Sequence, residues 1–168
     1  VIIYNIANAE ITTIFSKKEI DAAWVPEPTA TMLVENFGGK RLFQEQDIWP
    51  DKKFPSVLLV GRTEYVDKHP DIIKKWILAN QKSIDWINQN PQQAESAFIN
   101  FYKKHTGKTL NQNIVHTSFS TIEYTSKIDE KAISLFAQRA YSLGYLGRNG
   151  YNLDDIYANS MEIKQWQN

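Results

Sequence analysis

Hydrophobic positions in the first 44 residues alternate between short apolar runs and helical spacing. Residues 1–6 and 19–25 are short runs with strand character, and residues 40–44 are short and extended. Residues 8–18 and 27–39 instead space their apolar side chains as helices do, and the second of these ends at a glycine pair. The resulting order, strand, helix, strand, helix, strand, predicts a parallel sheet with covering helices.

The pattern changes in the middle of the chain. Residues 45–55 are charged, contain two prolines and resemble a linker. The apolar run 56–62 has the length of a buried strand. The sequence therefore predicts a boundary in this region.

The remainder of the chain is predicted to be mainly helical. Residues 67–90 form a long amphipathic pattern with Pro70 in the first turn, and residues 91–107 begin with proline and end at glycine. A third helical pattern spans 129–147, and a short helical turn is expected from Asn152.

Composition and charge exclude several classes of function for this chain. The chain has 168 residues, of which 42% are hydrophobic, so it can bury a core as one domain or two small lobes. Basic and acidic residues both total 19, which leaves no net charge to attract nucleic acid. The absence of cysteine excludes disulfides, thiolate zinc sites and a cysteine nucleophile.

Motifs for catalysis are absent from the sequence. His69, His105 and His116 are not spaced as metal ligands, and no HExxH motif occurs. There is also no GxSxG motif or glycine-rich phosphate loop. We therefore expect neither an enzyme nor a bound metal or cofactor.

An ordered set of motifs resembles a known family. The segments "KKEIDAAWVPEPTATMLVENFGGKRL", "FPSVLLVGRTEYVDKHPDII" and "AQRAYSLGYLGRNGYNLDDIYANS" are similar to substrate-binding proteins of ABC importers. The similarity is to the group that binds nitrate, aliphatic sulfonates, taurine or thiamine-pyrimidine precursors. It covers essentially the whole chain but only the C-terminal part of such a protein, as the strand-like start without an initiator methionine also indicates.

The resemblance implies an α/β, periplasmic-binding-protein-like (type II) fold with two lobes and a ligand cleft between them. Residues 1–50 would be the second half of lobe 2, 51–62 the crossover or hinge strand, and 63–168 the C-terminal helical part of lobe 1. Because the rest of both lobes is expected elsewhere, uncovered edges could pair two copies into a dimer.

The stretch "DAAWVPEPTA" contains the principal candidate ligand residues. It is predicted to lie between a parallel strand and a helix, where ligands bind in open α/β sheets. Trp24 could supply a flat wall, Pro26 and Pro28 would fix the backbone, and Glu27 could contact the ligand. Alternatively, Glu27 is a favourable acid at a helix start and Trp24 is packed in the core.

The resemblance adds Phe54 and Ser56, which would line the hinge side of the cleft as a wall and a hydroxyl donor. Taurine-type members place an acid where this chain has Val57, and the difference favours a ligand without an amine.

The hydroxyl-rich stretch 116–129 could form a second wall of the cleft. The candidates are Ser118, Ser120 or Tyr124, although ordinary loop chemistry explains the same composition.

The sequence thus predicts a solute-binding component of an ABC importer, which captures a small molecule and delivers it to a membrane permease. The expected location is the periplasm or the extracellular surface, with a lipid anchor where the bacterium uses one. The alternatives are a thiamine-pyrimidine biosynthesis enzyme of the same fold and a ligand-sensing domain.

Overall fold

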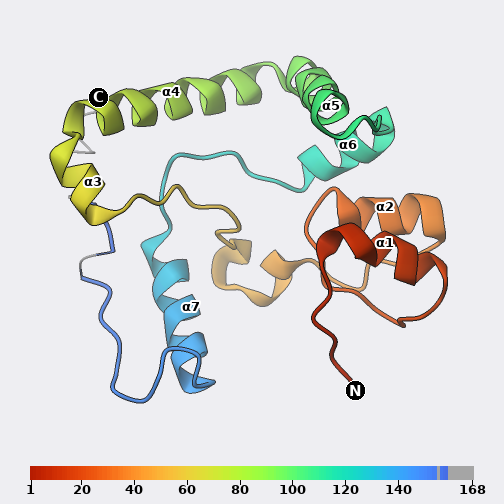
Figure 1. Cartoon of the computed structure of the whole chain (residues 1–168), viewed down its shortest axis with the longest axis horizontal. Coiled ribbons are helices and arrows are strands. Elements are labelled where there is room, and N and C mark those ends of the chain that lie inside the picture. Colours follow the sequence, from red (N-terminus) through yellow and green to blue (C-terminus); the bar gives the residue numbers. More distant parts are fainter. Residues whose placement is uncertain (155, 159–168) are drawn as a thin grey trace. The chain divides into compact units, whose positions relative to one another are not determined.

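The computed structural model describes residues 1–154 and 156–158. Seven α-helices and two 3-10 helices occur in this part of the chain, in the order shown in Figure 1. Their bounds are α1 (Asn8–Ser16), α2 (Thr29–Phe37), η1 (Glu45–Ile48), η2 (Pro50–Lys52), α3 (Thr63–Lys68), α4 (Pro70–Gln89), α5 (Pro91–Thr106), α6 (Gln112–Ser120) and α7 (Glu130–Ser142). The chain divides into two compact units, which are described separately.

The first unit comprises residues 1–43 and 89–123. Helix α1 packs on α2, α2 packs on α6, and α6 packs on α5. Apolar side chains from these helices form its core, and Val115 of α6 is completely buried. The buried apolar residues of this unit are Ile11, Leu33, Ala94, Leu110, Ile114 and Val115.

The ends of α2 and α5 follow from local chemistry. Gly38 and Gly107 adopt the left-handed conformation, with φ of 69° and 72°, which glycine enters without the steric cost of a Cβ atom. After Gly38 the chain turns so tightly that a Cβ atom on Gly39 would lie 2.9 Å from the carbonyl oxygen of Leu33. Both residues of the glycine pair are therefore required by the turn that follows α2.

The second unit comprises residues 44–88 and the described residues from Tyr124 onward. It contains the long helix α4, which begins at Pro70, whereas Asp67 and Lys68 at the start of the predicted amphipathic pattern instead end helix α3. Its most buried aromatic side chain is Trp49, with Ala132 and Ala137 of α7 also buried. The predicted linker 45–55 folds here into the two 3-10 helices.

The predicted strands are not confirmed. Residues 1–6, 19–25, 40–44 and 56–62 follow an irregular path, and the part of the chain that the structure describes contains no β-strand. A strand is stable only when a neighbouring strand pairs with its backbone groups, and no such neighbour accompanies these segments. The apolar side chains of residues 57–60 consequently remain exposed.

The loop that would explain the composition of residues 116–129 does not begin at His116. His116 and Ser118 lie in helix α6, which packs against α5 and α2. The side chain of Asn111 caps its first turn by accepting a hydrogen bond from the backbone of Asn113 over 2.8 Å. The short helical turn expected from Asn152 is not formed in the described residues, where the side chain of Asn152 accepts a hydrogen bond from the backbone of Asp154 in a simple turn.

Candidate functional site

A cluster of polar side chains surrounds Glu27 at the start of α2. One carboxylate oxygen, Oε2, accepts a hydrogen bond of 3.0 Å from the backbone N–H of Thr31, a group that the first turn of a helix leaves without a partner in the helix. The other oxygen, Oε1, accepts from Nη2 of Arg41 over 2.7 Å. Glu27 therefore caps the helix and forms an ion pair at the same time.

Thr31 and Ser118 complete the cluster on its buried side. The Thr31 side chain is almost fully buried and accepts a second hydrogen bond from Arg41 Nη2 over 3.1 Å. The hydroxyl of Ser118 lies 3.3 Å from Glu27 Oε2 but only 2.6 Å from the carbonyl oxygen of Ile114. Because a hydroxyl has one proton, the shorter bond to the α6 backbone is the stronger of the two.

These contacts set the ionisation of Glu27. Burial by itself would raise the pKa of this carboxyl group, since it disfavours the charged form. The hydrogen bonds from Arg41 and Thr31, together with the charge of Arg41, outweigh burial and lower the pKa below its ordinary value of 4.5. Glu27 is thus a carboxylate at neutral pH, which suits a helix cap and an ion pair.

An exposed aromatic pair lies on the same two segments. Trp24 is 70% exposed, and its ring meets the ring of Phe43 edge to face with 5.4 Å between the centroids. Trp24 contacts Phe43, and Glu27 contacts Arg41. As the first segment advances from Trp24 to Glu27, its partner in the second segment moves back from Phe43 to Arg41. The two segments therefore run in opposite directions at this point, unlike the parallel strands that the sequence predicts.

The four predicted residues of the 21–30 stretch differ in burial. Glu27 and Pro28 are half-buried and joined by a cis peptide bond, whereas Trp24 and Pro26 are exposed. Of the second-wall candidates, Ser118 reaches this cluster from α6. Ser120 is exposed and donates to the carbonyl oxygen of Thr117.

Phe54 and Ser56 belong to the second unit. The Phe54 ring lies 5.1 Å from the ring of the buried Trp49 and 6.3 Å from that of Phe136. Trp49 also stacks on Phe136 and carries the guanidinium of Arg139 4.6 Å above its ring. Phe54 is therefore part of an aromatic cluster, while Ser56 is exposed.

A second polar cluster in the first unit was not predicted from the sequence. Glu95 of α5 is buried, and its two carboxylate oxygens pair with Gln112 Nε2 and His116 Nδ1 of α6, each over 2.9 Å. The carboxylate accounts for the position of His116 at this helix contact. Among the described residues, no group of three or more acidic or histidine side chains could hold a metal ion.

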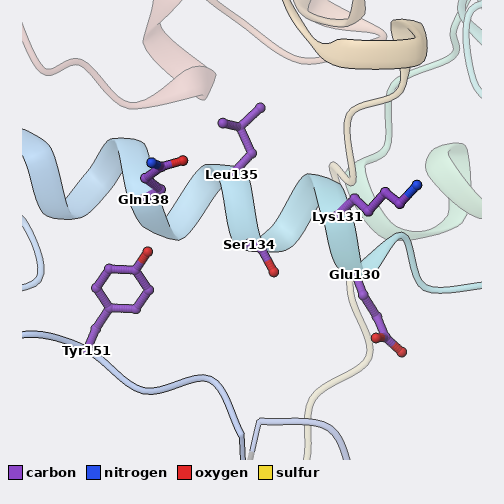
Figure 2. A pocket seen from close by; sticks show the side chains of 6 residues that line it. All are labelled: Glu130, Lys131, Ser134, Leu135, Gln138 and Tyr151. Atoms are coloured by element: carbon purple, nitrogen blue, oxygen red, sulfur yellow. The ribbon is translucent and has the colours of Figure 1, made fainter.

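A hollow of about 600 Å³ lies beside α7 in the second unit, and none of the predicted site residues lines it. Figure 2 shows Ser134 and Tyr151 on one side of the helix and Leu135 on the other, so the side chains do not converge on one point. The residues that line it are Glu130, Lys131, Ser134, Leu135, Gln138 and Tyr151. The polar and aromatic groups around Glu27 are more closely organised, and we take them as the candidate site.

Three residues of this site were not predicted from the sequence, namely Thr31, Arg41 and Phe43. Threonine in a helix is not distinctive, and Arg41 is one of 19 basic residues. A usable signal was its position two residues after the glycine pair that ends α2, where the chain turns back.

Comparison with known proteins identifies relatives of the chain. Curated proteins of Brucella abortus (strain 2308), Brucella suis biovar 1 (strain 1330) and Brucella melitensis biotype 1, each provisionally named a binding protein, are 31% identical over 94 residues. The match covers 55% of this chain but only 29% of each relative, so the chain spans less than a third of their length. No solved structure matches the chain.

A family model covers more of the sequence. The model of the NMT1-like family matches residues 1–100, which include the whole of the "DAAWVPEPTA" stretch and Arg41. Since this match extends over more than half of the 168 residues, the chain belongs to the NMT1-like family.

Proposed function

We propose that the chain is part of the solute-binding component of an ABC importer, which captures a small molecule and delivers it to a membrane permease. The family implies a periplasmic-binding-protein-like fold, and the relatives' names indicate a binding role. Within the class, the proposed ligand resembles nitrate, a sulfonate or taurine, or a thiamine-pyrimidine precursor. Val57, in place of the expected acid, favours a ligand without an amine.

The observation that carries this proposal is an exposed tryptophan beside an ordered polar cluster. A large apolar ring that stays open to solvent loses the free energy of burial, about 1.5–3 kcal/mol for a large apolar side chain, unless a ligand or another surface covers it. Trp24 is in this situation, and Glu27 with its partners lies three residues away. A small number of polar groups next to an aromatic wall is typical of small-molecule sites.

The finer assignments belong to the same proposal. Trp24, Pro26, Glu27 and Pro28 would contribute one part of the ligand site, with Phe54 and Ser56 contributing another. The division into 1–50, 51–62 and 63–168 would follow the lobes and crossover of the whole protein, and a dimer could form through uncovered segments. The location would be periplasmic or extracellular, with or without a lipid anchor. None of the helices in the described residues combines the length and the hydrophobicity of a membrane span.

The test is native mass spectrometry of the purified protein, which detects and weighs any small molecule that it retains. We expect a retained solute that is lost in Trp24→Ala and weakened in Ser56→Ala. Trp76→Ala, which changes an exposed tryptophan of α4, is the matched control and should retain the solute. A retained solute that the protein chemically converts would instead support an enzyme of the same fold.

A further inference from the structure

We infer that Arg41 selects a small organic anion, a carboxylate or a sulfonate, at the Trp24 surface. This inference rests on the proposed solute-binding function and concerns the same site. It assigns the ligand-facing charge to Arg41 and gives Glu27 the role of holding Arg41 in place. The argument depends on which of the two charges still has unused hydrogen-bonding capacity.

Glu27 has little capacity left for a ligand. Its side chain is 11% exposed, and both carboxylate oxygens already accept hydrogen bonds, from Thr31 and Arg41, with Ser118 close to one of them. Adding a ligand donor would require breaking the helix cap or the ion pair. Glu27 is therefore better suited to positioning its neighbours than to contacting a solute.

Arg41 has hydrogen-bond donors that its contacts with Glu27 and Thr31 do not use. A guanidinium carries five N–H groups, and both bonds that Arg41 makes, to Glu27 and Thr31, come from Nη2. Its Nε and Nη1 hydrogens have no partner among residues 1–154 and 156–158. The side chain is 31% exposed, so these donors can reach a solute. Their fork geometry matches the two oxygens of a carboxylate or sulfonate.

The two contacts of Nη2 fix the orientation of the guanidinium. A free arginine side chain loses considerable rotamer entropy when it binds a ligand, and a side chain already held in place loses less. The carboxylate of Glu27 and the buried hydroxyl of Thr31 hold Arg41 from two sides. The pair is also neutral overall, so selection would depend on hydrogen-bond geometry more than on long-range attraction.

The aromatic pair explains why the anion should be organic. Phe43 follows Arg41 by two residues, and both contact the segment that carries Trp24 and Glu27. Trp24 is 70% exposed and Phe43 is 48% exposed. A solute with an oxyanion at one end and an apolar body could thus place its charge on Arg41 and its body on the rings.

Calorimetric titration with two anions and a neutral analogue tests this inference. Butanesulfonate and pentanoate are the probes, and butyl methyl sulfone is the uncharged control. We expect saturable binding of at least one anion, no measurable binding of the sulfone, and a loss of affinity of about tenfold or more in Arg41→Gln. Arg62→Gln, an arginine of the second unit, should bind like the unmodified chain.

Chemical modification provides the second measurement. Phenylglyoxal labels exposed arginines, and mass spectrometry can follow the four arginines of the chain separately. The bound anion should protect Arg41 and leave Arg62, Arg139 and Arg148 unprotected. Arg41→Lys, which keeps the charge but not the fork, should show intermediate affinity, and helix content measured by circular dichroism should be unchanged in both Arg41 variants.

Failure of the inference and failure of the proposed function give different results. Unchanged anion affinity in Arg41→Gln, or absence of binding by both anions while native mass spectrometry still detects a retained solute, would overturn the role of Arg41 alone. If no anion binds and no solute is retained, both the role of Arg41 and the solute-binding function are contradicted.

Discussion

Arg41 donates a hydrogen bond to Glu27 across fourteen residues of sequence, with 2.7 Å between Nη2 and Oε1. The same carboxylate caps α2 through the backbone of Thr31. The pair therefore fixes the first turn of α2 to the segment that follows its last turn. Substitutions in this cluster should alter local stability as well as binding, and the two effects can be measured separately.

Removal of the Glu27 carboxylate should destabilise the start of α2. Loss of a helix cap costs about 1 kcal/mol, and Glu27→Ala also removes the bond to Arg41, so we expect a total of about 1–3 kcal/mol. Hydrogen exchange of the Thr31 amide is the direct measurement, because that N–H loses its acceptor. Glu10→Ala is the control. Glu10 is also an acid in the first turn of a helix, but helix α1 has no side-chain hydrogen bond at its N-cap. Unchanged exchange at Thr31 would contradict the cap.

The stability of this cluster should depend on acid pH. Because the folded pKa of Glu27 is lowered below 4.5, protonation favours the unfolded state, which binds the proton more readily. The stabilisation is therefore complete above pH 4.5 and is lost as the pH falls through the lower folded pKa. The chemical shift of the Thr31 amide, followed by NMR, should titrate with a midpoint below 4.5. A midpoint above 4.5 would mean that burial dominates, and Glu27→Gln should abolish the titration.

Gly39 should tolerate no side chain. A Cβ atom there would lie 2.9 Å from the carbonyl oxygen of Leu33 and 3.3 Å from the ring of Phe15, so Gly39→Ala should cost about 1–3 kcal/mol through overpacking. Gly38→Asn is the matched control at the neighbouring position, because asparagine adopts the left-handed conformation at little cost. Urea denaturation distinguishes the two variants. Equal stability of both would show that the turn can relax.

The buried carboxylate of Glu95 depends on its two partners. Gln112→Ala or His116→Ala alone leaves one hydrogen bond, whereas the double variant leaves a buried charge without a side-chain partner. The double variant should therefore be destabilised by more than the sum of the singles, towards about 3–5 kcal/mol. His105→Ala is the control, since His105 is exposed and its partner is Phe101 of the same helix, through a hydrogen bond to the backbone carbonyl and a ring contact. Strict additivity in the double-mutant cycle would exclude this coupling.

Local chemistry allowed several helices to be predicted from the sequence, and its limits explain the rest. Helices α4 and α5 begin at Pro70 and Pro91 because the signals at their ends act within one turn. The structure of α6 was missed, since its serine, threonine and asparagine residues are typical of loops and its packing on α5 is a long-range contact. The prediction of strands was wrong for a related reason. A strand forms only when its backbone pairs with another strand, and the sequence of one segment does not specify that neighbour.

The candidate site divides in the same way. Glu27 at a helix start was predicted, and its capping bond depends only on a residue four positions later. Its partner Arg41 is separated by the whole of α2 and the turn at Gly38, so its contact depends on the path of that turn. The exposure of a tryptophan also depends on the tertiary structure. The residues next to Trp24 and Trp49 in the sequence do not indicate which of the two is buried.

The difference between these two tryptophans provides a final prediction. Trp24 is 70% exposed, whereas Trp49 is 7% exposed beneath Arg139 and donates from Nε1 to Glu45 over 2.7 Å. Acrylamide quenches exposed indoles by collision, so Trp24→Phe should remove part of the readily quenched fluorescence. Trp49→Phe should instead remove part of the protected fluorescence. If Trp24→Phe reduced the protected fraction, the ring would be covered in solution, and the surface on which the ligand site is proposed would not be open.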